Sequence, residues 1–291
     1  MSTLVFKRGE PLLMSTLANM PLVASQKAVQ PAAPVASPKA VQPEAPSAAH
    51  KFSLPDSIKL VDDIDAAIAI LNDDSTSTVN TVVVERAAAV VPAKVWDGVA
   101  APSKFVLVLP DPVDDAASAK KTLEVALAAR MDGLGTGHRA ALAARVVELA
   151  AGFAWCLGGR RSIRAKLSVG AQGDLRAVQP CPKFHADTVP MRLIATLVGR
   201  GTQVLGDDAV AHVAESGPTV VRDGYAPYDA AAGDAVILVG RLGAGGARRP
   251  GVHRSPPPPC DCCDDARRVV LVLDADDEAV FGKPDVFKAR D

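Results

Sequence analysis

Four short segments rich in valine, isoleucine and leucine follow Gly158, and no long helical pattern separates them. Each is bounded by glycine, proline or aspartate, which is typical of strands. The segments are Ser162–Val169, Met191–Gly199, Asp234–Gly240 and Arg267–Asp274. Consecutive strands without crossover helices favour an antiparallel sandwich or barrel over a sheet of βαβ units. The second half of the chain is therefore predicted to form a compact β unit.

The first half of the fold has a mostly helical pattern. Asp56 is placed to cap a helix whose apolar positions, from Ile58 to Leu71, follow helical spacing. Two further helices, rich in alanine and leucine, are predicted at residues 115–131 and 137–156 and are joined by a glycine-rich turn. The turn follows a helix and lacks the Lys-Ser/Thr of a P-loop, so it does not indicate a nucleotide site.

Only two strands are predicted in this first half, at residues 78–85 and 105–109, where β-branched or apolar side chains are concentrated. Helices in the first half and strands in the second predict an α+β fold. The upstream helices are expected to pack on the β unit.

The first 52 residues differ from the rest in composition. The stretch Ser25–Pro46 consists mainly of Ala, Pro, Val, Ser and Gln, and the sequence Lys-Ala-Val-Gln-Pro occurs at 27–31 and again at 39–43. Dense proline blocks helices and sheet ladders, so a flexible, partly polyproline segment is predicted. Scarce acidic residues fit an organelle transit peptide, and a plain disordered tail fits equally well. The protein is accordingly expected in the cytoplasm, or in a plastid or mitochondrion if this leader directs import.

Charge and composition argue against several classes of partner. The chain has 32 basic and 33 acidic residues, a formal net charge of −1, whereas nucleic-acid binders carry a basic excess. Aromatic residues make up 4% of the chain, which leaves few platforms for stacked bases. No run of about 18 apolar residues occurs, so no membrane span is expected. Five cysteines, three of them clustered at 260–263, are too few for a disulfide framework and favour a reducing compartment.

The segment most informative about function runs from Cys181 to Asp187. His185 and Asp187 are two residues apart, and alternate side chains of an extended chain point to the same face. A second histidine, His253, lies between two predicted strands. Two imidazoles and one carboxylate on one face of an ion leave positions open for substrate, as in the facial triad of non-heme Fe(II) oxygenases. The alternative is a structural His-Asp pair on a loop, because an isolated HxD motif is common by chance.

Basic residues near these positions are candidates for binding an acidic cosubstrate. Arg267 and Arg268 open the strand after His253, and either guanidinium is suited to pair with a carboxylate of 2-oxoglutarate. Alternation lets only one of them face inward, and the uniformly apolar strand does not reveal which. Arg192 is a second candidate anion clamp. Cys181 is either an additional thiol near the metal, as a ligand or a redox-sensitive group, or a small buried residue.

These blocks resemble a known family. Residues 181–187, 189–196, 199–202 and 253–257 look like the domain-of-unknown-function family 1826, and the resemblance covers roughly residues 60–275. The family's pattern is similar to the double-stranded β-helix of Fe(II)/2-oxoglutarate-dependent oxygenases, with an HxD pair, a distal histidine and a following basic residue. Some bacterial members lie near zinc-handling GTPase genes. The resemblance therefore implies a metal site that serves either oxygenase catalysis or non-catalytic zinc binding.

We thus predict an α+β protein whose helical N-terminal part packs on a C-terminal double-stranded β-helix of the jelly-roll or cupin type. The first hypothesis is an oxygenase in which His185, Asp187 and His253 hold Fe(II), with 2-oxoglutarate as cosubstrate and an unknown small molecule or peptide as substrate. The second is a non-catalytic protein of this fold that binds Zn(II) in zinc homeostasis, and the third is an interaction protein that has lost the metal. The predicted domains are a leader at 1–52, a helical support region at 53–158, a metal-binding β core at 159–280 and a tail at 281–291.

Overall fold

The computed structural model describes residues 54–88, 91–100, 103–159, 161–170, 181–213, 219–245, 248–257 and 267–276. These residues belong to one compact unit that the chain forms from Phe52 onward. The predicted leader, the cysteine cluster at 260–263 and the predicted tail lie outside the described residues. The fold is of the α+β class that the sequence predicts, with helices packed on one face of a large sheet.

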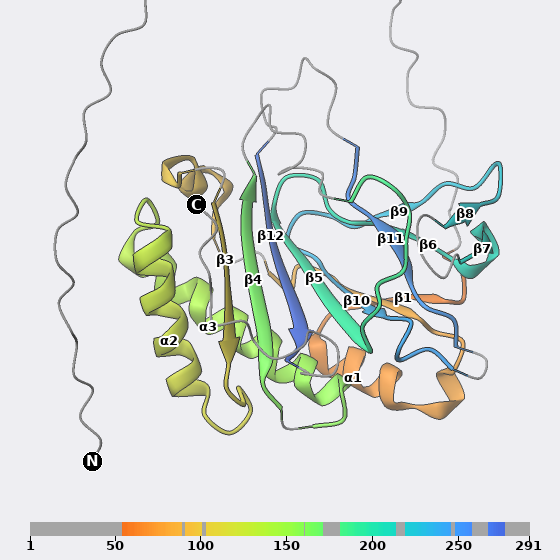
Figure 1. Cartoon of the computed structure of the whole chain (residues 1–291), viewed down its shortest axis with the longest axis horizontal. Coiled ribbons are helices and arrows are strands. Elements are labelled where there is room, and N and C mark those ends of the chain that lie inside the picture. The colour runs from red at the N-terminus through yellow and green to blue at the C-terminus, as the bar shows by residue number, and fades with distance from the viewer. Residues whose placement is uncertain are drawn as a thin grey trace, which may run out of the picture. The chain divides into compact units, whose positions relative to one another are not determined.

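A seven-stranded sheet forms the body of this unit (Figure 1). In sheet order its strands are β1 (Ile58–Val61), β2 (Thr81–Val84), β10 (Ala235–Val239), β5 (Met191–Val198), β12 (Arg268–Ala275), β4 (Ile163–Gly170) and β3 (Ser103–Leu109). Neighbouring strands are antiparallel except for the parallel pair β1 and β2. The four strands predicted in the second half are confirmed, and they are adjacent in the sheet as β10, β5, β12 and β4.

Two smaller sheets complete the β structure. They have the order β11 (Val252–Arg254), β6 (Gln203–Leu205) and β9 (Tyr228–Asp229), and the pair β7 (Val210–His212) and β8 (Val220–Val221). Ile194 and Val236 of the large sheet pack in one apolar cluster with Val204 of β6. The large sheet and the three-stranded sheet therefore enclose a second, smaller core.

Three helices cover the other face of the large sheet (Figure 1). The helical segments are α1 (Ile64–Asn72), α2 (Ala116–Arg130) and α3 (Thr136–Cys156), with the 3-10 turns η1 (Asp74–Thr76), η2 (Ala93–Gly98) and η3 (Asp207–Ala209). The main core joins Leu123 and Leu149 of the helices to Leu167 and Leu271 of the sheet. Both predicted alanine-rich helices are confirmed, as α2 and α3. No helix in the described part of the chain is long and apolar enough to cross a membrane.

The start of the described chain differs from the prediction. Ile58–Val61 forms strand β1 beside β2, and α1 begins only at Ile64. Asp63 caps this helix in place of Asp56, and its carboxylate accepts a hydrogen bond from the N–H of Ala66 at 2.7 Å. Apolar residues at 58 and 61 fit a strand or a helix, and pairing with β2 decides between them. The two strands predicted in the first half are confirmed as β2 and β3, and helices account for most of the structured residues there. The strand β1 was not predicted, and all three strands join the large sheet.

The glycine-rich segment between α2 and α3 is an interhelical turn, as predicted. Gly133 lies against the backbone at the end of η2, and a Cβ at Gly133 would come within 1.8 Å of the carbonyl oxygen of Gly98. Gly137, in the first turn of α3, has open space where its Cβ would stand. Packing therefore requires glycine at the first of these positions and not at the second.

Gly133→Ala is expected to lower the free energy of unfolding by about 2 kcal/mol, because its methyl group would overlap a backbone carbonyl that has no alternative rotamer. Gly137→Ala is the matched control. It should leave this free energy unchanged or raise it by up to about 1 kcal/mol, since alanine is the better helix former. Urea denaturation followed by circular dichroism measures both variants. Equal stability of the two would contradict the close approach at Gly133.

Candidate metal centre

One isolated β-bridge brings together two histidines that are far apart in the sequence. The N–H of His185 donates to the carbonyl oxygen of His253, and the N–H of His253 donates to that of His185, each at 3.0 Å. The ring centroids lie 4.5 Å apart, with the rings tilted by 44°. Because β11 is an outer strand of the three-stranded sheet, the bridge attaches the His185 segment to that sheet.

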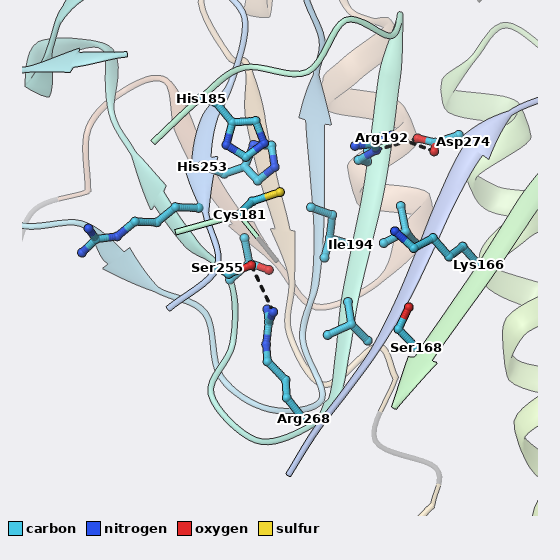
Figure 2. Close-up of a pocket in the computed structure, with 14 residues that line it drawn as sticks. Lys166, Ser168, Cys181, His185, Arg192, Ile194, His253, Ser255, Arg268 and Asp274 are labelled. Atoms are coloured by element: carbon cyan, nitrogen blue, oxygen red, sulfur yellow. Dashed lines mark hydrogen bonds and ion pairs between the residues drawn. The ribbon is translucent and has the colours of Figure 1, made fainter. Parts of the chain in front are cut away.

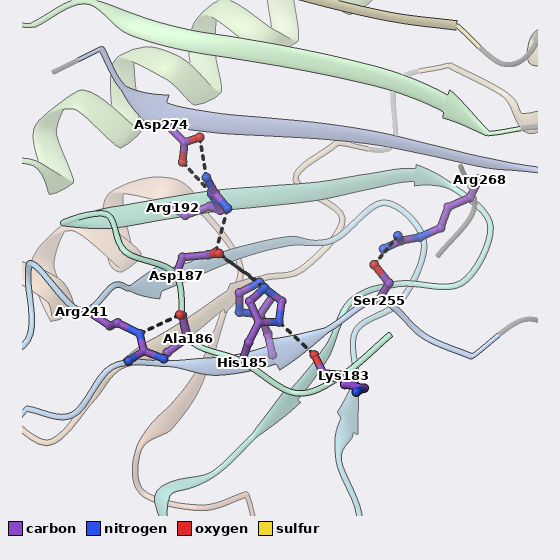
Figure 3. A network of polar contacts seen from close by, with 10 residues as sticks. Lys183, His185, Ala186, Asp187, Arg192, Arg241, Ser255, Arg268 and Asp274 are labelled. Atoms are coloured by element: carbon purple, nitrogen blue, oxygen red, sulfur yellow. Dashed lines mark hydrogen bonds and ion pairs between the residues drawn. The ribbon is translucent and has the colours of Figure 1, made fainter. Parts of the chain in front are cut away.

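Asp187 completes a cluster of three side chains. Its Oδ1 lies 3.5 Å from Nε2 of His185, and its Oδ2 lies 3.3 Å from Nε2 of His253. One ligand atom from each residue lies within 4.8 Å of the other two. Figure 3 shows Asp187 between His185 and Arg192. The structure therefore brings together the three residues that the sequence analysis proposes as ligands. Two come from one extended segment and the third from another.

Contacts outside the cluster orient its members. Nδ1 of His185 lies 3.0 Å from the backbone oxygen of Lys183, so this nitrogen carries a hydrogen and Nε2 is left facing Asp187. Asp187 Oδ2 lies 2.9 Å from Nη1 of Arg192. The same guanidinium donates to both oxygens of Asp274, from Nε at 2.7 Å and from Nη2 at 2.8 Å. This row of charges ties the carboxylate of the cluster to strands β5 and β12.

Burial and neighbouring charges give the three groups different protonation states. Hydrogen bonds with Asp187 and Cys181 raise the pKa of His185 to about 10. Burial lowers the pKa of His253 to about 4. Burial opposes ionisation of Asp187, but the hydrogen bond from His185 and nearby positive charge outweigh it and hold the pKa of this carboxyl well below its usual range. At neutral pH the cluster therefore carries a protonated imidazole, a carboxylate and a neutral imidazole.

A cavity of about 150 Å³ opens beside the cluster (Figure 2). Its floor is made by alternate residues of three strands of the large sheet, on the face turned away from the helices. These floor residues are Lys166 and Ser168 of β4, Arg192 and Ile194 of β5, and Arg268, Val270, Val272 and Asp274 of β12. His185 and His253 lie at the wall, so the two imidazoles of the cluster face the cavity.

The two adjacent arginines at the start of β12 lie on opposite faces of the sheet. Arg268 lines the cavity, and its Nη1 lies 3.3 Å from Oγ of Ser255 (Figure 2). Burial lowers the pKa of this guanidinium to about 10, so it remains a cation at neutral pH. Arg267 instead donates to the carbonyl oxygen of Val99 at 2.9 Å, next to η2. Of the two cosubstrate candidates, Arg268 faces the cavity and Arg267 does not.

Two other candidate residues have surroundings that the sequence did not predict. Arg192, considered as an anion clamp, is already neutralised by Asp187 and Asp274, so its charge is used within the protein. Cys181 is exposed, not buried, and it lines the cavity. Its hydrogen bond with His185 lowers the pKa of the thiol. The thiol lies beside the cluster but is not one of the three converging ligand atoms.

Ser255 and Lys166 are among the cavity residues that were not recognised from the sequence. Ser255 lies two residues after His253, and the same alternation that pairs His185 with Asp187 would have placed it on the cavity side. Lys166 lies within a predicted strand, but its position opposite β12 depends on the strand register, for which the sequence carries no signal.

One protein-family model matches the part of the chain that contains the cluster. The model described as "Protein of unknown function (DUF1826)" matches residues 65–274. The chain belongs to this family. The resemblance seen in the motif blocks is therefore confirmed, and the matched range contains all three residues of the cluster.

Solved structures similar to this DUF1826 protein include two plant dioxygenases and a fungal protein. The auxin-oxidising dioxygenase of rice is 17% identical over 73% of this chain and 78% of its own, with a TM-score of 0.35. The 2-oxoglutarate complex of AtDAO1 from Arabidopsis thaliana is 13% identical over 75% and 91%, with a TM-score of 0.39. A full-length Neurospora crassa protein in complex with alpha-KG and thymine is 15% identical over 75% and 85%, with a TM-score of 0.35. No curated protein matches the chain.

The cluster is expected to bind one divalent ion. His185→Ala and His253→Ala should each weaken binding of Mn(II) by at least about 100-fold, because each removes one of three ligands. His212→Ala is the matched control, since His212 is exposed on β7, and should leave the affinity unchanged. Isothermal titration of the metal-free protein without oxygen measures all three. Equal affinity in His185→Ala and the wild type would contradict the assignment.

Ion binding is also expected to release a proton. Because the pKa of His185 is raised to about 10, its ring is protonated at neutral pH, and a metal must displace that proton to reach Nε2. The affinity should therefore rise by about tenfold per pH unit between about pH 6 and pH 8. His253 is already neutral in this range and contributes no proton. Titrations in buffers of different ionisation enthalpy count the protons, and a pH-independent affinity would refute the expectation.

Proposed function

We propose that this DUF1826 protein is an Fe(II)- and 2-oxoglutarate-dependent oxygenase. The observation that carries the proposal is the convergence of two imidazoles and one carboxylate beside a cavity, which both imidazoles line together with a buried arginine. Two His and one carboxylate are the donor set of non-heme Fe(II) oxygenases, and three ligands leave positions open for other molecules. In this proposal His185, Asp187 and His253 hold the iron.

The side chains of the cluster fit such an ion. Oδ2 of Asp187 is buried and accepts no well-aligned hydrogen bond among the described residues, although the Arg192 guanidinium lies 2.9 Å away. This oxygen therefore retains a lone pair for a cation. His253 offers a neutral ring at pH 7, and the contact of His185 with Lys183 leaves Nε2 of His185 toward Asp187. Arg192 positions the carboxylate from the sheet.

Arg268 is proposed to bind the distal carboxylate of 2-oxoglutarate. It is a buried cation that faces the cavity, and Ser255 beside it adds a hydroxyl donor. A planar guanidinium pairs with a carboxylate through two parallel hydrogen bonds. Ile194, Val270 and Val272 line the floor between this arginine and the cluster, and these apolar side chains exclude water from the bound molecule. When bound, iron and keto acid supply the oxidising chemistry, while the protein positions them.

The arrangement of the sheets supports the same proposal. The cluster lies where the edge of a small three-stranded sheet meets the open face of the large antiparallel sheet. Two facing antiparallel sheets with a metal between them are what the family resemblance implies, namely a double-stranded β-helix. We infer that β4, β5, β10 and β12 form its larger half.

Consumption of 2-oxoglutarate tests the proposed function. The protein loaded with Fe(II) under nitrogen and then exposed to oxygen should convert 2-oxoglutarate to succinate. Arg268→Met should raise the KM for 2-oxoglutarate at least tenfold, which corresponds to about 1.4 kcal/mol and is modest for a charged hydrogen bond. Arg267→Met is the matched control, because the neighbouring guanidinium faces the helices, and its KM should stay within about twofold.

The outcomes separate the hypotheses. Tight Zn(II) retention with no succinate formed in the Fe(II)-loaded protein would refute the oxygenase and favour a metal-binding role. An equal rise in KM for both arginine variants would refute the assignment of Arg268 as the carboxylate ligand.

A further inference from the structure

Four lysine and arginine side chains line the cavity, and three of them are engaged by the protein itself. The three are Arg192, bound to two carboxylates, Arg268, bound to Ser255, and Arg254, whose Nε donates to Oε1 of Gln203 at 2.6 Å. Arg254 also lies over the ring of Phe184, 4.2 Å from its centroid. Only the fourth cation, Lys166, lacks such an engagement among the described residues.

Lys166 is half-buried on β4, and its side chain points into the cavity (Figure 2). It has no hydrogen bond or ion pair with any residue that the structure describes. The carboxylate that acts on Lys166 electrostatically, Asp274, is bound by Arg192. A partly desolvated ammonium group without a counter-charge is costly unless a ligand supplies one.

The register of the sheet relates Lys166 to Arg192, the residue that holds the carboxylate of the cluster. Lys166 stands opposite Val272, which stands opposite Ile194. The adjoining row contains Asp274 and Arg192, the residue that holds Asp187. Neighbouring strands lie about 4.8 Å apart and successive residues on one face about 7 Å apart. A group bound by Lys166 therefore lies over the floor of the cavity, two strands and one row away from Arg192 and so to one side of the cluster.

We propose that Lys166 binds the carboxylate of an anionic substrate and determines which substrates the protein accepts. The inference rests on the proposed oxygenase function in that it names the substrate of the same site. Val272 and Ile194, beside the ammonium, provide an apolar surface for hydrocarbon. The substrate class is therefore a small aliphatic acid that is distinct from the keto acid bound by Arg268.

Matched sets of small ligands test this inference. Butanoate, hexanoate and octanoate, each with its primary amide and its amine, are titrated into the full chain with Mn(II) and saturating 2-oxoglutarate in the absence of oxygen, and binding is followed by ligand-detected NMR. At least one acid should bind at least tenfold more tightly than its amide. Lys166→Met should abolish this preference and Lys166→Arg should retain most of it. Lys120→Met, on the exposed face of α2, should change nothing.

Three results would overturn the inference: equal binding of acids and amides to the wild type, an unchanged preference in Lys166→Met, or a loss of 2-oxoglutarate affinity in Lys166→Met as large as that of Arg268→Met. The last would make Lys166 part of the cosubstrate site. Repeating the titration without metal and 2-oxoglutarate separates the two proposals. An acid preference that depends on Lys166 in a protein that never consumes 2-oxoglutarate would refute the oxygenase and keep the anion site. Turnover without such a preference would refute only the role of Lys166.

Discussion

Two backbone hydrogen bonds between His185 and His253 are the contact on which the candidate site depends. They attach the segment around His185, which lies outside the strands of the fold, to the edge of the three-stranded sheet. The imidazoles are thereby brought into contact without help from their own side chains, and Asp187 follows because it shares a face with His185. Backbone pairing, not side-chain attraction, therefore creates the cluster.

The carboxylate of Asp187 is stabilised by charges from both sides. An unpaired buried carboxylate costs several kcal/mol, and Asp187 avoids this cost through Arg192 and the protonated His185. Asp274 in turn holds Arg192 with two hydrogen bonds, so the network is anchored in the large sheet. In the metal-free protein the proton on His185 supplies the positive charge that a cation would bring. The site is thus oriented for an ion before one binds.

Local patterns in the sequence predict the main strands and the residues that converge in the cluster. They do not predict which strands, distant in the sequence, pair with one another. The HxD spacing gives His185 and Asp187 a shared face wherever the segment is extended, whatever it pairs with. By contrast, the apolar positions before α1 suit a helix or a strand, and only pairing with β2 selects the strand. Arg267 and Arg268 are equivalent in the sequence because the strand is apolar on both faces. Alternation with apolar residues places Lys166 on the polar face of β4, whereas its position opposite Val272 depends on strand register, which the sequence does not encode.

The opposed arginines at the start of β12 connect the two layers of the fold. Arg268 faces the cavity, and Arg267 is bound to carbonyl groups of η2 and of the residue that follows it. Because the two residues are consecutive, the start of the strand cannot shift on one face without shifting on the other. The helical layer is therefore more than a cover for the core. Substitutions that shift η2 would therefore change the position of Arg268 and the shape of the cavity around it, while the three candidate ligands stay in place.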